Sequence, residues 1–207
     1  RGRTAHPRQL IHITAVSSHG VRRGDGWSTL SGLKQLAPLL LTNNLSDRMR
    51  GDRDVQPVLV RAGPGTGKTW SAQQLAHELA VGVSLDDGLH MHGVPVLLYV
   101  QRLARFVRGA RGTKAADFLR LYLEHEYTGD VRQQILLAAY GLRTLIVILD
   151  GVDEASGLKD KVEDFVLHTL AHDRVSLVVT SRPEGVTLDG YEDRFVVYDL
   201  KPLDDAQ

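Results

Sequence analysis

A glycine-rich stretch from Ala62 to Thr69 contains the residue types that a phosphate-binding loop needs. It reads Ala-Gly-Pro-Gly-Thr-Gly-Lys-Thr, so Ala62 stands where the strict pattern begins with Gly. Glycines allow backbone angles that side chains forbid, and backbone amides can then turn toward phosphate oxygens. Lys68 is expected to contact β- and γ-phosphates, and Thr69 to bind Mg²⁺ through its hydroxyl. The predicted nucleotide-binding residues are Gly63, Pro64, Gly65, Thr66, Gly67, Lys68, Thr69 and Trp70.

A cluster of acids follows a second apolar run, Leu145 to Leu149. Asp150 comes at the end of this predicted strand, where parallel sheets bind ligands, so we expect it to hold Mg²⁺ opposite Thr69. Asp153 or Glu154 could orient or deprotonate an attacking water. The alternative is an acid-rich turn with no catalytic role. The phosphate-binding loop in the same chain favours the catalytic interpretation.

A third group of polar residues, Thr180-Ser181-Arg182-Pro183, follows another apolar run. Arg182 could reach the γ-phosphate of a bound nucleotide and so report its presence. The alternative is an ordinary strand end with a solvated arginine. Because the chain also contains the phosphate-binding loop and the acidic cluster, we favour the sensing role for Arg182.

The elements that must position these residues alternate between strands and helices. Strands are expected at 58–61, 96–100, 145–149, 175–180 and 195–198, and helices at 68–81, 115–126, 131–141 and 158–171. This alternation predicts an α/β fold with a parallel sheet and helices on both faces. Residues 1 to about 27 are expected to be irregular, apart from a possible strand at 10–16. Leucines between residues 30 and 45 predict helical packing that is broken or kinked at Pro38.

Composition excludes several classes of protein. The 207 residues include 25 basic and 25 acidic ones, so net charge does not favour nucleic acid as a partner. The absence of cysteine rules out disulfides and cysteine metal sites, and it fits a reducing, cytoplasmic compartment. No segment reaches the ~18 apolar residues of a membrane span. The chain begins at Arg1 and ends in what resembles the start of a helix, so we expect a fragment of a longer protein.

In their order and spacing, the three motifs resemble those of the NACHT-type NTPases, a branch of the STAND class of P-loop ATPases related to AAA+ proteins. The matching segments are Gly63–Thr69, Leu149–Glu154 and Thr180–Pro183. The second segment is the most telling. In this family a small residue follows the magnesium-binding Asp, and acids come two and three places later, whereas many AAA+ enzymes have Glu directly after the Asp. The resemblance covers residues 55–207.

The resemblance implies a five-stranded parallel P-loop NTPase sheet in the order 5-1-4-3-2, sandwiched by helices. It implies that ATP or ADP binds with Mg²⁺. Lys68 would be the phosphate lysine, Asp150 the magnesium ligand and Arg182 the sensor arginine. Residues 55–207 would be a NACHT-type core truncated before its helical and winged-helix domains, which supply part of the adenine contacts. Residues 1–54 would be an N-terminal arm and helical lead-in.

The implied function is a signalling or assembly switch with slow Mg²⁺-dependent ATP hydrolysis, protein partners and self-association in the full-length protein. Alternatives are a motor-type AAA+ ATPase, a nucleotide-binding scaffold without turnover, and a P-loop kinase. Gly151 directly after Asp150 favours the switch over the motor. The intact Lys68, Thr69, Asp150 and Glu154 argue against a scaffold. The chain shows no lid signature of a kinase.

Overall fold

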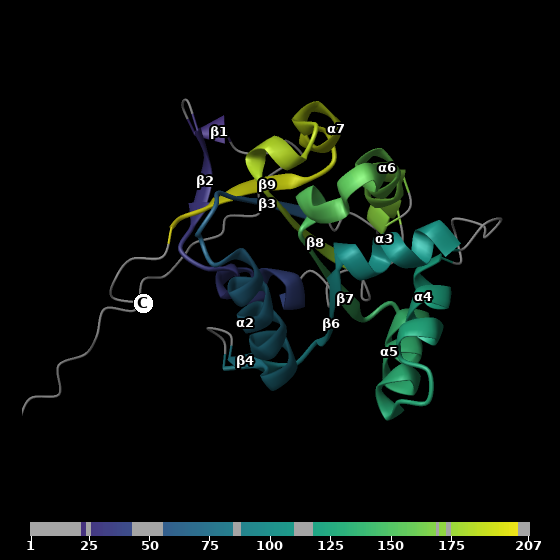
Figure 1. The fold of residues 1–207 in the computed structure, drawn as a ribbon. Coiled ribbons are helices and arrows are strands. Elements are labelled where there is room, and N and C mark those ends of the chain that lie inside the picture. Colours follow the sequence, from purple (N-terminus) through teal and green to yellow (C-terminus); the bar gives the residue numbers. More distant parts are fainter. Residues whose placement is uncertain are drawn as a thin grey trace, which may run out of the picture.

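The sheet at the centre of the fold is formed by strands from both ends of the described sequence (Figure 1). The computed structural model describes residues 22–23, 26–42, 56–84, 88–109, 118–168, 170–172 and 175–202. Within them the strand order is β1-β2-β9-β3-β8-β7-β6. The strands are β1 (Arg22–Arg23), β2 (Gly26–Leu30), β3 (Val58–Ala62), β6 (Val94–Tyr99), β7 (Leu145–Asp150), β8 (Ser176–Ser181) and β9 (Val196–Leu200).

The five strands predicted from the sequence are β3, β6, β7, β8 and β9, and they lie in the predicted order with parallel pairing. The α/β fold class of a P-loop NTPase is therefore confirmed. The predicted number of strands is wrong, because β2 adds a sixth parallel strand beside β9 and β1 pairs with β2 in antiparallel fashion. Without β2, the backbone N–H and C=O groups on one side of β9 would lack hydrogen-bond partners in the sheet.

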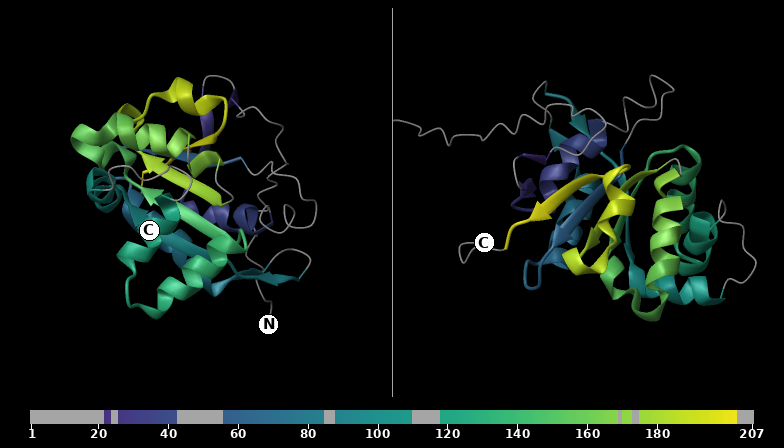
Figure 2. Two further views of the ribbon diagram at one scale, coloured as in Figure 1. Left: turned by 90° about the vertical axis from the view of Figure 1, so that its right-hand side faces the viewer. Right: turned by 90° about the horizontal axis from the view of Figure 1, so that it is seen from above.

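Helices cover both faces of the sheet, as Figure 2 shows from two further sides. One face carries η1 (Leu33–Leu36), the helical residues 37–42 and α2 (Lys68–Val81). The other face carries α3 (Val100–Gly109), α4 (Phe118–Glu126), α5 (Val131–Gly141), α6 (Lys159–His168) and α7 (Leu188–Glu192). Short 3₁₀ segments connect these elements: η3 (Val152–Leu158), η4 (Leu170–His172) and η5 (Pro183–Gly185).

Alternate residues along each strand pack into the hydrophobic clusters on opposite faces of the sheet. In β7, Ile146 and Ile148 pack toward α2, whereas Leu145, Val147 and Leu149 pack toward the opposite helical layer. This follows from the two-residue period of side chains along a strand. Every residue of β7 is buried, as expected of a central parallel strand covered on both faces.

Two local expectations are wrong. Residues 26–30 form β2 rather than a loop and the start of a helix, because their backbone pairs with β9. Val100, expected at the end of a strand, begins α3. The apolar residues of α3 recur at helical spacing and are buried: Val100, Leu103 and Ala104. The arginines between and after them, Arg102 and Arg105, are exposed.

Some expectations fall outside the described residues, namely the strand at 10–16, the leucine at 45 and the helix start after residue 202. A small antiparallel hairpin of β4 (Val83–Ser84) and β5 (His90–Met91) follows α2. None of the helices in the described part of the chain combines the length and apolarity that crossing a membrane requires.

Candidate functional site

The phosphate-binding loop connects β3 to α2 at the carboxyl edge of the sheet. Gly65 and Gly67 adopt φ values of 75° and 69°, a left-handed conformation that favours glycine. Thr66 is buried, and its hydroxyl donates to the carbonyl of Gly63 at 2.8 Å. This internal hydrogen bond closes the loop and supports its shape.

The N-terminus of α2 faces this loop with its positive dipole end. Gly67 is the N-cap residue and provides no side-chain cap, and the first turn, Lys68 to Ser71, carries no acid. Backbone amides at a helix start commonly bind anions when side chains leave them accessible. The loop and helix start together fit the phosphates of a nucleotide.

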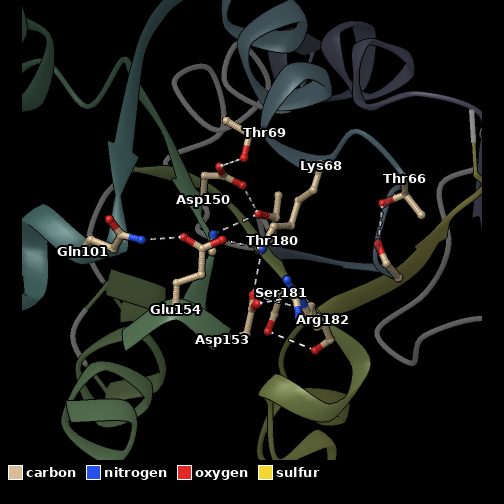
Figure 3. Close-up of polar contacts among 12 residues, drawn as sticks. Thr66, Lys68, Thr69, Gln101, Asp150, Asp153, Glu154, Thr180, Ser181 and Arg182 are labelled. Carbon is tan, nitrogen blue, oxygen red and sulfur yellow. Dashed lines mark hydrogen bonds and ion pairs between the residues drawn. The ribbon is translucent and has the colours of Figure 1, made fainter. Parts of the chain in front are cut away.

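Asp150 joins the loop to the neighbouring strands (Figure 3). Thr69 Oγ1 donates to Asp150 Oδ2 at 2.7 Å, and Thr180 Oγ1 donates to Asp150 Oδ1 at 2.5 Å. The Asp150 residue is only 4% exposed, and Thr180 is fully buried. Asp150 and Thr69 thus bring two oxygen ligands together, which suits Mg²⁺, a cation that prefers oxygen donors and retains water or phosphate ligands.

Asp153 is the point where two cations from different motifs meet (Figure 3). Lys68 Nζ lies 2.8 Å from Asp153 Oδ1, and Arg182 Nε lies 3.2 Å from Asp153 Oδ2. The backbone N–H of Arg182 also donates to Asp153 Oδ1, at 3.1 Å. Burial alone would raise the pKa of Asp153, but these contacts, led by Lys68, outweigh it and hold the pKa below its ordinary value. The carboxylate is therefore ionised at neutral pH.

Glu154 lies beside this cluster but is more accessible, with 40% of its side chain exposed. Its Oε1 is 3.6 Å from Lys68 Nζ, and its Oε2 accepts a hydrogen bond from Gln101 Nε2 at 3.0 Å. Gly151 lets the turn before Glu154 form, since it has a φ of 84° and a Cβ there would lie 3.0 Å from the Glu154 side chain. The small residue after Asp150 therefore has a steric role.

Sequence reasoning missed Gln101 as a site residue. It belongs to α3, which follows β6 at the same sheet edge. The only available signal was its position directly after a predicted strand. A glutamine two residues after Tyr99 is unremarkable without knowledge that α3 begins there.

Trp70, predicted from the sequence to contact the nucleotide, is 52% exposed at the start of α2. The buried face of α2 is formed by Ser71, Ala72, Leu75 and Leu79. The small residues Ser71 and Ala72 at the start of this face let α2 approach the sheet closely, whereas Trp70 remains exposed to solvent.

Gly185 packs closely against the backbone and Cβ of Asp153. A Cβ on Gly185 would lie 2.3 Å from Asp153 Cβ, closer than real contacts allow, and 3.0 Å from the Asp153 Cα, which is also tight. Replacing Gly185 with alanine is expected to lower the free energy of unfolding by about 2 kcal/mol, because overpacking displaces η5 or η3. Urea denaturation of both proteins measures this difference.

A matched control for Gly185→Ala is Gly157→Ala in η3. No described atom lies within 4 Å of a Cβ at Gly157. This substitution should change the free energy of unfolding by less than about 0.5 kcal/mol. Equal effects of the two substitutions would contradict the close approach of η5 to Asp153.

Comparisons with known proteins add little at the level of sequence. No family model matches this chain, and neither does any curated protein. Among solved structures it is similar to PCH-2 of C. elegans, with a TM-score of 0.44 and 16% identity. The alignment covers 84% of this chain but only 42% of the PCH-2 chain. Similarity at this level identifies no family.

The strand order of the sheet and the geometry of the loop support a nucleotide-binding, ATPase-like domain with a P-loop fold. Six of the residues singled out from sequence meet at one edge of the sheet. They are Lys68, Thr69, Asp150, Asp153, Glu154 and Arg182. Pro64, Gly65 and Trp70 lie exposed around them.

Proposed function

We propose that this chain is the nucleotide-binding core of an ATP/ADP switch of the NACHT type, which hydrolyses ATP slowly. The observation that carries the proposal is the 2.7 Å contact between Thr69 Oγ1 and Asp150 Oδ2. It joins the phosphate-binding loop to the acidic strand end, as Mg²⁺-dependent nucleotide binding requires. Bound Mg²⁺ would neutralise phosphate charge between these two ligands.

The other site residues would each bind a different part of the nucleotide's phosphate chain. Amides of Gly63, Gly65 and Gly67 and the α2 N-terminus would bind phosphate oxygens. Lys68 Nζ would bind the β- and γ-phosphates, and Arg182, whose side chain is about half exposed, would bind the γ-phosphate. Because ADP lacks this last phosphate, Arg182 would distinguish the two nucleotides, which is what a switch needs.

Glu154 is the better candidate for the general base. Both carboxylate oxygens of Asp153 already accept from cationic groups, and its lowered pKa makes it a weak base. Glu154 is more open to water, and Gln101 orients it. A base must lie within hydrogen-bond reach of the attacking water, so accessibility favours Glu154.

Replacing Glu154 with glutamine is expected to lower ATP turnover by at least about a hundredfold and to change ATP affinity little, because general-base catalysis contributes ~10²–10⁴ in rate. Phosphate release and direct binding titrations measure the two effects separately. Glu184→Gln, at an exposed position in η5, is the matched control and should leave turnover unchanged. Full turnover by Glu154→Gln would remove Glu154 from the mechanism.

The switch itself is tested by binding and turnover of this chain. We expect ATP and ADP to bind with a requirement for Mg²⁺ that is stronger for ATP, and steady-state hydrolysis to remain slow. Sustained rapid turnover would favour a motor ATPase instead. Binding without any turnover would favour a scaffold, and absence of binding would overturn the proposal.

The wider context is also a proposal. Residues 55–207 would form the nucleotide-binding core, and residues 1–54 an N-terminal arm and helical lead-in, of which residues 26–42 complete the sheet edge and its helical cover. Protein partners and self-association through a longer protein, in the cytoplasm, would turn nucleotide state into a signal. The near-neutral net charge supports protein partners over nucleic acid.

A further inference from the structure

The carboxylate of Asp153 neutralises the same two cations that a terminal phosphate would need. Lys68 Nζ is 2.8 Å from one oxygen, and Arg182 Nε is 3.2 Å from the other. The side chains of Asp153 and Lys68 are both about nine-tenths buried. Their attraction is therefore less screened by water than that of a surface ion pair.

Asp153 itself cannot easily move away from these cations. It belongs to η3, and Gly185 packs directly against its Cα and Cβ. It also accepts from the backbone N–H of Arg182, which ties it to the end of β8. Of the two cations, the half-exposed Arg182 side chain has the freedom to change partner.

We propose that Asp153 is a specificity-determining residue that sets the preference between ATP and ADP. This inference rests on the proposed function. To bind, a γ-phosphate must displace Asp153 from Arg182 and compete with Asp153 for Lys68. The negatively charged γ-phosphate is also repelled by the Asp153 carboxylate. ADP reaches Lys68 but leaves the Arg182–Asp153 pair intact. Asp153 therefore weakens ATP binding more than ADP binding and biases the site toward ADP.

The test is the ratio of ATP to ADP affinity in Asp153→Asn, measured by isothermal titration with Mg²⁺. Asparagine keeps the shape against Gly185 and removes the charge. We expect ATP to bind about tenfold more tightly, equivalent to ~1.4 kcal/mol, and ADP affinity to change less than about threefold. Asp189→Asn on α7, at an exposed position, is the matched control and should leave both affinities unchanged.

A double-substitution cycle with Arg182→Gln distinguishes competition for Arg182 from a general charge effect. In the Arg182→Gln background, Asp153→Asn should shift the ATP/ADP ratio by less than about twofold, because the contested cation is gone. A shift as large as in the wild-type background would overturn the proposal. So would equal tightening of ATP and ADP, or loss of turnover in Asp153→Asn with unchanged affinities, which would make Asp153 the base.

Failure of the inference can be told apart from failure of the proposed function. If the wild-type chain binds both nucleotides and Asp153→Asn leaves their ratio unchanged, only the inference falls. If neither protein binds ATP or ADP while both remain folded by circular dichroism, both proposals fall. Should Asp153→Asn not fold, the smaller Asp153→Ser removes the charge without crowding Gly185 and gives the same readout.

Discussion

Replacing Lys68 with alanine is expected to weaken ATP binding by at least about a hundredfold. Lys68 lies at the start of α2, and its side chain is about nine-tenths buried, so the bound phosphates lose a charge that water replaces poorly. Truncating one partner of a buried charge pair typically costs ~2–5 kcal/mol, and a hundredfold change corresponds to ~2.7 kcal/mol. Titration of ATP into the two proteins with Mg²⁺ measures the ratio of dissociation constants.

The control for this experiment is Lys161→Ala on α6, where the lysine is exposed on a surface remote in sequence from the loop. It should leave ATP affinity within about twofold of the wild type. Thermal unfolding of both variants is needed as well, because Lys68→Ala removes the nearest cation from Asp153. A folded Lys68→Ala protein that binds ATP as the wild type does would overturn nucleotide binding at this loop.

Replacing Thr180 with valine is expected to lower the free energy of unfolding by about 2–3 kcal/mol. The fully buried Thr180 hydroxyl donates to Asp150 Oδ1 and accepts from the Gly151 N–H at 3.1 Å. Valine has nearly the same shape but leaves a buried carboxylate oxygen without this donor. Such an unsatisfied group costs ~1–3 kcal/mol, and more when it is charged. Urea denaturation measures the change.

Thr180→Ser is the matched variant, because it keeps the hydroxyl and removes only a methyl group. It should lower the free energy of unfolding by about 1 kcal/mol, the cost of a buried methylene-sized group. If serine and valine are equally destabilising, the hydroxyl contacts are not what holds Asp150. The same pair of variants reports on Mg²⁺: valine should weaken metal-dependent ATP binding and serine should not.

Much of the central sheet was predictable because β7 and β8 are buried at every position. Apolar runs such as Leu145 to Leu149 have few alternatives in a chain that alternates strands with helices. The carboxyl ends of parallel strands share one edge, so the motifs after β3, β7 and β8 were expected to meet. Helix α2 occupies its predicted residues, 68–81, because the loop sets its start and Gly82 follows its end.

The parts that sequence missed depend on partners distant in the chain. Nothing in residues 26–30 indicates a strand without the exposed edge of β9 beside them. Gln101 became a site residue only because α3 begins at Val100, directly after β6. Spacing could not separate the roles of Asp153 and Glu154. Their difference comes from which carboxylate faces Lys68 and Arg182 at close range, a property of the η3 turn.

The pairing of β2 with β9 has a consequence for how the protein is made. Ser28 pairs with Tyr198, and the Lys201 N–H donates to the Leu30 carbonyl. Among the described residues, the first parallel strand of the sheet to leave the ribosome therefore pairs with the last. Until β9 emerges, Leu30, Leu33 and Leu36 lack part of the surface that buries them. Contacts that span nearly the whole chain form late and slow folding. Nascent chains cut before residue 196 should therefore depend on chaperones that cover apolar segments.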